Sequence, residues 1–333
     1  MSSSHTLGNF ATSKPLKQTI SAPKQIAYFS HFPGPTPDGC SDQSRSALKL
    51  YSPPTTPFQL LVAPPDRDSA DLSNQRGHLD YIPLQSIITA CRRAGRTADL
   101  AEADVITNRS TLVDLAMGKS GEYGVTFVEG KLFILRKSLE LWDSDCFERA
   151  CARLMTEKPH GVFFSVVRRK IGDYDVIMAG EVDCTDKKPK TKDYIGLETL
   201  KVPQQWQSQY DPDSDVTSNP DCVVLYPKWY LQSYLLGVPT LQIGYRNCNN
   251  AVFDIVRRPV KHFLSEVQIH APMFNLAVDL GRLHGILSAL SAYFRTLGRS
   301  FPANARFVLE VDVNGNANII LRETRRTRRS DYR

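Results

Sequence analysis

Apolar positions recur along the chain with both helical and strand spacing, and the strand patterns concentrate in its middle. The longest helical pattern covers residues 274–297, where leucines return every three or four positions. Further helices are predicted from about Pro83, over 142–158, and over 229–237, where a glycine ends the pattern. We expect these apolar stripes to pack against a common core.

Runs rich in β-branched and aromatic residues predict strands between these helices. Three of them follow one another over 161–170, 175–185 and 193–202. Turn signals predict three hairpins, at Glu129-Gly130, Asn249-Asn250 and Asn314-Gly315. The pattern therefore predicts a single α+β domain, with a central mixed β-sheet flanked by helices.

The two ends of the chain differ from this middle in composition. Residues 1–30 are rich in Ser, Thr, Lys and Pro, which predicts a flexible N-terminal arm before a domain over 31–323. Residues 324–333 contain five arginines and form a basic tail. A solvated run of charge is one interpretation of this tail, and a nuclear-import or RNA-phosphate patch is the other.

Composition narrows the class of protein. The 333 residues allow a sizeable core, and a formal charge of +6 is compatible with a polyanionic partner. The seven cysteines form no Cys-x-x-Cys pair, which favours reduced thiols over a zinc site or a disulfide framework. The chain has no apolar run of the roughly 18 residues that a membrane span needs, so we expect no membrane partner and a nuclear or cytoplasmic location.

The sharpest local signal is the pair of acids Glu181 and Asp183, two positions apart on a predicted strand. A period of two places both carboxylates on one face of the strand. Neighbouring like charges are unfavourable without a counter-charge, and Mg²⁺ or Mn²⁺ would provide one through oxygen ligands. The alternative is a solvent-facing strand end with two solvated acids.

A metal nuclease commonly adds a second strand that bears Glu-x-Lys, with both side chains on one face. The strand predicted over 193–202 contains Glu198 and Lys201, but three positions separate them. On a regular strand these side chains point to opposite faces. Only a β-bulge between them would bring them together.

Three further residues have both a functional and an ordinary interpretation. Glu148 borders the apolar stripe of the helix predicted over 142–158, as an inward-facing acid or as a surface glutamate. Gln232 lies on the helix predicted over 229–237, where a hydrogen-bonded interior amide explains it equally well. Arg109 follows a short apolar run and alone would be a surface arginine.

Taken in order, three segments between Phe163 and Arg246 resemble the central block of the DXO-like decapping nuclease family. Their sequences are SVVRRKIGDYDVIMAGEVDCTD, DYIGLETLK and PKWYLQSYLLGVPTLQIGYRN. The resemblance implies a nuclease-like metal site at the sheet. It also implies hydrolysis of phosphoanhydride or phosphodiester bonds at RNA 5′ ends, namely incomplete caps, triphosphates and nicotinamide caps.

The resemblance further implies a cofactor, partners and site residues. The cofactor is Mg²⁺ or Mn²⁺, the ligand is an RNA 5′ end or a nucleotide, and a nuclear 5′–3′ exoribonuclease is a candidate partner, as for fungal members of the family. Arg109, Gln232 and Glu181 would bind substrate, Glu181 and Asp183 would act in catalysis, and Glu148, Asp183 and the main chain of Leu197 would hold metal.

The third motif of the family, Glu-apolar-Asp, is intact in this sequence as Glu181, Val182 and Asp183. The chain departs from the family in its fourth motif, where the family has Glu-Leu-Lys after a tyrosine. Aligned on Tyr194, this sequence has Gly196 in place of the acid and Glu198 in place of the lysine. Glu198 would restore the site if it took the catalytic and metal-binding roles of the acid. Lys201, brought round by a bulge, would then contact the substrate.

Three hypotheses follow. The first is an active metal-dependent hydrolase of RNA 5′ ends, slowed by the altered fourth motif. The second is a family member that binds RNA, nucleotide or protein without turnover. The third is a different enzyme on the same scaffold, because function lies in the site rather than in the fold.

Overall fold

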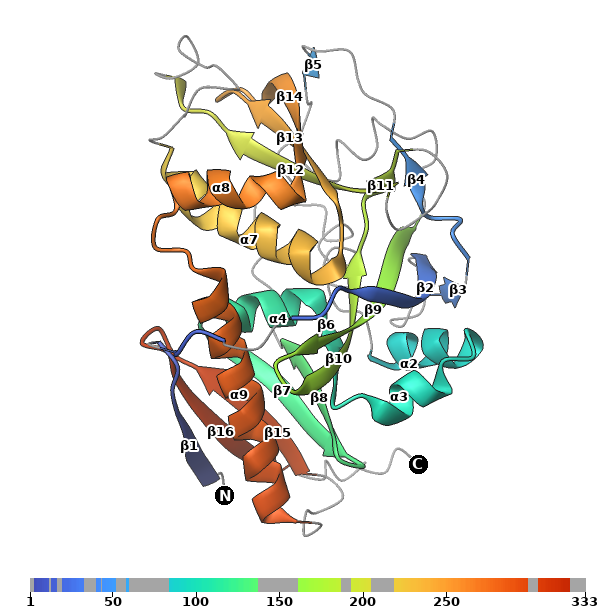
Figure 1. Cartoon of the computed structure of the whole chain (residues 1–333), viewed down its shortest axis with the longest axis vertical. Helices are drawn as coiled ribbons and strands as arrows, with labels where there is room; N and C mark the ends of the chain where they lie inside the picture. The colour runs from blue at the N-terminus through green and yellow to red at the C-terminus, as the bar shows by residue number, and fades with distance from the viewer. Residues whose placement is uncertain are drawn as a thin grey trace, which may run out of the picture.

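The computed structural model of the protein describes two mixed β-sheets and the helices that cover them (Figure 1). The described residues are 3–11, 13–16, 20–32, 40–42, 44–51, 58–59, 84–136, 161–186, 193–204, 219–298 and 305–323. The predicted helix over 142–158 and the basic tail over 324–333 lie outside them. The mixed sheet and the flanking helices that the sequence predicted are confirmed, and a second sheet is added to them.

The larger sheet has ten strands, in which β6 runs parallel to β8 and to β10 while the other pairs are antiparallel. In spatial order they are β1 (Ser3–Asn9), β16 (Asn316–Glu323), β15 (Ala305–Val311), β7 (Gly121–Val128), β8 (Lys131–Arg136), β6 (Val105–Asn108), β10 (Tyr174–Glu181), β9 (Val162–Ile171), β2 (Lys24–Phe32) and β3 (Cys40–Asp42).

The smaller sheet has six strands and includes two parallel pairs, β4 with β11 and β12 with β13. In spatial order its strands are β4 (Lys49–Leu50), β11 (Cys184–Thr185), β12 (Tyr194–Lys201), β13 (Thr240–Arg246), β14 (Ala251–Pro259) and β5 (Phe58–Gln59). The three strands predicted over 161–202 are therefore present, but they are divided between two sheets.

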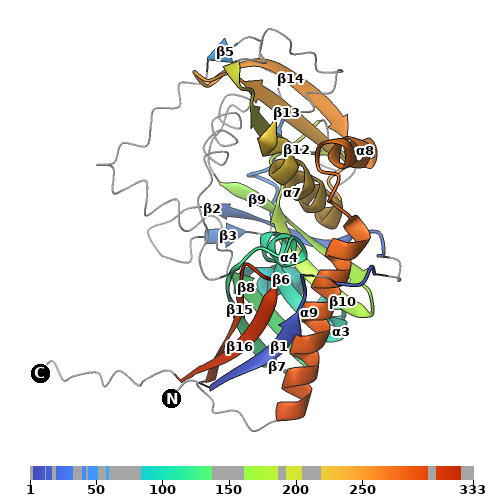
Figure 2. The ribbon, with the colours of Figure 1, turned by 90° about the vertical axis from the view of Figure 1, so that its left-hand side faces the viewer.

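Six helices are described. They are α2 (Leu84–Arg93), α3 (Thr97–Glu102), α4 (Arg109–Ala116), α7 (Pro220–Leu236), α8 (Val260–His270) and α9 (Leu276–Leu297). The helix predicted from about Pro83 is α2, and the long pattern over 274–297 is α9. Two views at right angles show α9 along the larger sheet, and α7 with α8 against the smaller one (Figure 2).

The apolar stripe of α9 packs against the larger sheet, as its leucine spacing predicted. Leu283, Leu287 and Leu290 are fully buried and share a core cluster with Val125 of β7 and Leu309 of β15. Burial of each such side chain stabilises the fold by about 1.5–3 kcal/mol before entropy is subtracted. This apolar contact therefore holds α9 against the larger sheet.

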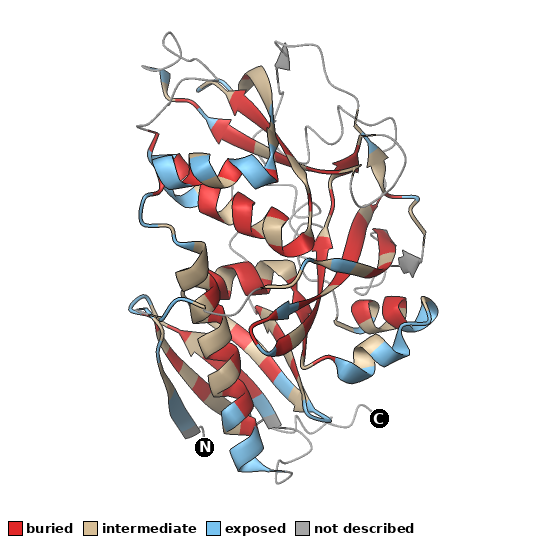
Figure 3. Ribbon diagram, viewed as in Figure 1, coloured by how far each residue is buried: buried red, intermediate tan, exposed pale blue. Residues whose placement is uncertain are grey.

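Helix α7 covers the smaller sheet and begins earlier than its sequence pattern suggested. Its N-cap Asn219 accepts a hydrogen bond from the Asp221 amide at 3.0 Å, and Gly237, at φ +80°, ends it. Trp229 is buried with Leu200 of β12 and with α8 residues. In the burial colouring, α7 alternates between buried (red) and intermediate (tan) segments along most of its length (Figure 3).

The residues described within the first thirty form two strands, where the composition predicted a flexible arm. Strand β1 pairs with β16, and β2 pairs with β9. Ile26, Ala27 and Phe29 of β2 are buried. The polar composition of this segment hid two strands, because strands at or near a sheet edge are stabilised by backbone hydrogen bonds and need few apolar side chains.

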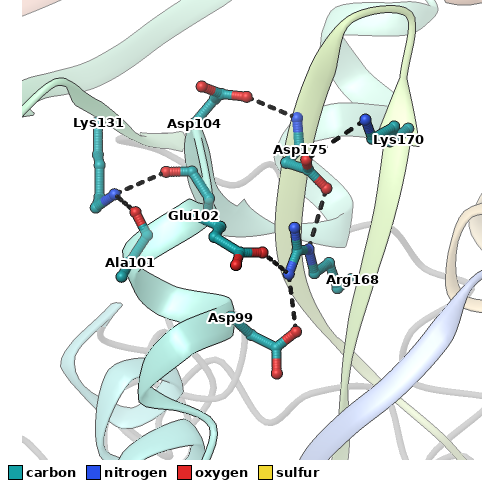
Figure 4. A network of polar contacts seen from close by, with 9 residues as sticks. Asp99, Ala101, Glu102, Asp104, Lys131, Arg168, Lys170 and Asp175 are labelled. Atoms are coloured by element: carbon teal, nitrogen blue, oxygen red, sulfur yellow. Dashed lines mark hydrogen bonds and ion pairs between the residues drawn. The ribbon is translucent and has the colours of Figure 1, made fainter.

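An ion-pair network holds α3 against the β9–β10 hairpin (Figure 4). Arg168 donates to Asp99 at 2.9 Å, to Glu102 at 2.9 Å and to Asp175 at 3.0 Å. Asp104 accepts from the Asp175 amide at 2.8 Å. These contacts give Arg168 a structural role, although it lies in the segment that resembles the family block.

Candidate functional site

The candidate site lies where the chain passes from one sheet to the other. Glu181 ends β10, Val182 and Asp183 link the sheets, and Cys184 begins β11. The Val182 amide still donates to the Phe163 carbonyl, at 3.0 Å. The sequence pattern predicted both acids on one continuous strand. Instead, Glu181 is the last residue of β10, and Asp183 lies in the two-residue link between the sheets.

Asp183 is joined to the fourth-motif strand. Its Oδ2 accepts a hydrogen bond from the Leu197 amide at 2.7 Å. Burial raises the pKa of this carboxyl above its ordinary value, while the Leu197 amide and the positive charges of Arg109 and Lys49 act in the opposite direction. A half-buried acid whose pKa is shifted by burial and by two nearby positive charges is typical of a functional site.

Gly196 lies directly opposite this carboxylate. A Cβ at position 196 would lie 3.9 Å from Asp183 Oδ2, 3.9 Å from Ser233 Oγ of α7 and 3.0 Å from Leu241 Cδ2 of β13. An acidic side chain there would therefore enter the space beside Asp183. The alignment of Gly196 with the family's acid is consistent with this geometry.

The pairing of β12 determines on which face of the strand Glu198 and Lys201 lie. The ladder from Ile195 to Lys201 pairs with β13 without a register shift. Glu198 is half-buried and shares the strand face of Gly196, whereas Lys201 is exposed and lies on the opposite face. The bulge that would have brought Lys201 to the site is absent from this ladder, so that part of the expectation was wrong.

Arg109 is brought to the site by the turn from β6 into α4. It is the first residue of α4, and its Nη1 donates to the Glu181 carbonyl at 3.1 Å. A Cβ on Gly180 would lie 3.0 Å from Arg109 Cδ, so glycine there permits the close approach. The residues around Arg109 could not distinguish it from a surface arginine, and only the family resemblance singled it out.

The other predicted residues fall into two groups. Gln232 is half-buried on α7, next to Ser233, whose hydroxyl faces position 196. Glu148 lies outside the described residues, so its predicted metal-binding role stays a prediction.

Lys49 was missed by the sequence reasoning. Strand β4 runs parallel to β11, with the Cα of Lys49 opposite that of Cys184, the residue after Asp183. Its charge acts on Asp183 and on Cys184. A two-residue strand has no periodicity, so no signal in the sequence could have placed it.

The carboxylates of the described residues are only part of a metal-ligand set. Within those residues, no three His, Cys, Asp or Glu side chains lie close enough together to hold a metal ion. Gly196 removes the acid that would have completed a group around Asp183, and Glu148 belongs to the part of the chain that the structure does not describe.

No helix in the described ranges is long and apolar enough to cross a membrane.

Comparison with known proteins gives the family. The family described as RAI1-like PD-(D/E)XK nuclease matches residues 156–331. The human decapping and exoribonuclease protein is 31% identical over 284 residues, which are 73% of this chain and 68% of that protein. The chain therefore belongs to the RAI1-like PD-(D/E)XK nuclease family.

Solved structures show the same fold. S. pombe Rai1 in complex with 3′-FADP has a TM-score of 0.70 at 18% identity, covering 97% of this chain and 99% of that one. Candida albicans Rai1 in complex with pU5 and Mn²⁺ has a TM-score of 0.67 at 17% identity, covering 97% and 94%. The expected family and fold are confirmed.

Proposed function

We propose that this protein hydrolyses phosphoanhydride or phosphodiester bonds at RNA 5′ ends, with a divalent metal ion as cofactor and at a rate lowered by its fourth motif. The observation that carries the proposal is the Asp183–Leu197 hydrogen bond, which holds the third and fourth motifs together at the sheet junction. The positive charge of Arg109, which donates to the Glu181 carbonyl at 3.1 Å, acts on the same acid.

The relatives support the substrate class. The human relative is named a decapping and exoribonuclease protein, C. albicans Rai1 was solved with pU5 and Mn²⁺, and S. pombe Rai1 with 3′-FADP. All three names or ligands concern RNA 5′ ends or nucleotides. We extend this class to the present chain, with incomplete caps, triphosphates and nicotinamide caps as substrates and Mg²⁺ or Mn²⁺ as the ion.

The lowered rate follows from two substitutions. Gly196 provides no carboxylate beside Asp183, and Glu198 places a negative charge where a lysine would attract phosphate. Loss of one group that stabilises transition-state charge costs about 10²–10³-fold in rate in well-studied enzymes. We therefore expect turnover that is measurable but slow.

The testing experiment is hydrolysis of 5′-triphosphorylated and capped RNA by purified protein with Mg²⁺ or Mn²⁺. Asp183→Ala is the inactive comparison, and Asp175→Ala, which changes an acid of the Arg168 network, controls for general effects of losing a carboxylate. Product that disappears only in Asp183→Ala supports the proposal. Equal traces of product from all three folded proteins would refute it.

A second candidate function is binding without turnover, and the fourth motif is the observation that favours it. A site that lacks an acid at position 196 and carries Glu198 can retain the positive charges that act on Asp183 while catalytic activity is lost. Such a protein would bind 5′-phosphorylated RNA equally well with and without divalent metal. Metal-independent binding together with undetectable hydrolysis would select this candidate.

The cellular setting is part of the proposal. A nuclear or cytoplasmic location and a nuclear 5′–3′ exoribonuclease as partner would both suit an enzyme of RNA 5′ ends. Affinity purification from the native cell tests whether an exoribonuclease binds this protein. The absence of any exoribonuclease from the recovered proteins would refute this part of the proposal.

A further inference from the structure

Strand β2 of the larger sheet contains a β-bulge. In its pairing with β9 the register shifts between Gln25 and Ala27, so Ile26 is an extra residue, and both Ile26 and Ala27 are buried in the apolar cluster that includes α2. The β9 partners of Gln25 and Tyr28 are two positions apart, which places these two side chains on the same face of the sheet, away from α2. On a regular strand, residues three positions apart face opposite sides, so the bulge is what directs Gln25 to this face.

The side-chain amide of Gln25 joins the two sheets. Its Nε2 donates to the Ser165 hydroxyl of β9 at 2.8 Å and to the Tyr194 hydroxyl of β12 at 2.9 Å. Ser165 and Tyr194 are both fully buried, and the Tyr194 ring packs edge-on against Phe163 of β9 with 6.0 Å between ring centroids. Gln25 therefore fixes the hydroxyl end of a tyrosine whose ring already packs against the larger sheet.

Tyr194 in turn holds the start of the fourth-motif strand. It is the first residue of β12, and a period of two places its side chain on the same face as Gly196. Its backbone is paired with Thr185 of β11, and three residues further on the Leu197 amide donates to Asp183 at 2.7 Å. The hydrogen bond between the third and fourth motifs thus depends on how the start of β12 is held.

We propose that Gln25 is a positioning residue for the candidate site: by holding Tyr194 against the larger sheet, it keeps the Leu197 amide within hydrogen-bonding distance of Asp183. Gln25 acts through Tyr194. β-Bulges that redirect a side chain are frequent beside active sites, and a displacement of about 1 Å caused far from the reacting atoms can lower a rate by about 10²-fold. The inference deepens the proposed function and rests on it only for the reaction that is measured.

The test compares Gln25→Met, Tyr194→Phe and the double variant with the wild type. Gln25→Met keeps the length of the side chain and removes its donors, whereas Tyr194→Phe removes only the hydroxyl and serves if Gln25→Met folds poorly. Gln268→Met, at an exposed glutamine of α8, is the matched control, and thermal melts establish that each variant is folded. The ¹H–¹⁵N resonance of the Leu197 amide, recorded without metal, reports its hydrogen bond to Asp183 and needs no turnover.

Both single variants should move the Leu197 amide proton upfield, because its hydrogen bond to Asp183 lengthens. The double variant should move it no further than the larger single effect, since both changes remove the same contact. In hydrolysis of 5′-triphosphorylated RNA with Mn²⁺, kcat should fall by about tenfold while KM stays within about twofold. Gln268→Met should change neither the resonance nor the two kinetic constants.

Two results would overturn the inference. One is a pair of variants that melt at a lower temperature but match Gln268→Met in the Leu197 resonance and in kcat, which would mean that Gln25 only stabilises the fold. The other is a double variant whose effects on the resonance add, which would mean that Gln25 does not act through Tyr194. A wild type without hydrolysis would sink the proposed reaction alone, because the Leu197 resonance would still decide whether Gln25 positions the site.

Discussion

Restoring the fourth motif is the most direct test of the site geometry. The change is Gly196→Glu together with Glu198→Lys, which rebuilds the family's acid and lysine. A Cβ at position 196 would lie 3.9 Å from Asp183 Oδ2, so the new carboxylate reaches the region where the third-motif acid lies. The comparison proteins are the wild type and Gly196→Gln, which has the same shape without the charge.

The cost without metal can be worked from these contacts. The 3.0 Å approach to Leu241 Cδ2 involves the end of a flexible side chain, and such overpacking costs about 1–3 kcal/mol. Two carboxylates about 5 Å apart repel by roughly 3 kcal/mol at an effective dielectric constant of 20, in part offset by the new lysine. We expect the metal-free double variant to be less stable than the wild type by about 2–4 kcal/mol.

Divalent metal should reverse this loss. At a concentration 100 times its Kd, a bound ion stabilises the native state by about 2.7 kcal/mol. Thermal melts with and without Mn²⁺ should therefore show a larger metal-dependent rise in Tm for the double variant than for the wild type or Gly196→Gln. Hydrolysis of 5′-triphosphorylated RNA should rise by about 10²-fold.

The control and the refuting result are equally specific. Adding Asp183→Ala to the double variant should abolish both gains. Leu241→Ala in the same background provides space if the variant folds poorly. A folded double variant with no more Mn²⁺ stabilisation than Gly196→Gln would refute the reasoning, because it would mean that position 196 does not face the metal-binding region.

Three further predictions concern stability. Burial raises the pKa of Asp183, so its contribution to stability is fully present below the unfolded pKa and is lost as pH rises through the folded pKa. Asp183→Asn should thus raise the free energy of unfolding at pH 7 and flatten the acidic part of the pH profile of urea unfolding, and an unchanged profile would contradict this. Arg169 is buried and donates to three backbone carbonyls, so Arg169→Met should cost about 3–5 kcal/mol in urea unfolding, against less than about 0.5 kcal/mol for the exposed neighbour Lys170→Met; similar losses for both would count against the role. The buried Thr199 hydroxyl has no hydrogen-bond partner among the described residues, so Thr199→Val should raise Tm slightly, and a clear fall would disprove that account.

The elements with strong periodicity could be predicted from the sequence. Helix α9 follows its leucine spacing almost residue for residue. The hairpins turn at the predicted dipeptides, where Glu129, Asn250 and Gly315 have positive φ. Helix α7 was predicted only in its last part, because Pro227 interrupts its pattern although the helix continues through it. Residues close together in the sequence determine these helices and turns, so local sequence patterns were sufficient to predict them.

The site was predictable only where residues carry a motif. The third motif identified Asp183, and the family resemblance identified position 196 as the missing acid. Lys49 could not be found, because its place depends on a two-residue strand that pairs with β11 from far away in the sequence. The flexible-arm prediction for residues 1–30 failed for the same reason, because β1 is defined by its pairing with β16 near the opposite end of the chain.

The link between the sheets has a consequence for how the molecule unfolds. Val182 is hydrogen-bonded into the larger sheet through Phe163, and Cys184 is paired with Ile195 in the smaller one. Unfolding of either sheet therefore disrupts the backbone hydrogen bonds that hold residues 182–184, which include Asp183. Amide exchange at Leu197, which donates to Asp183, would then report global rather than local opening, and partially unfolded forms would retain no competent site.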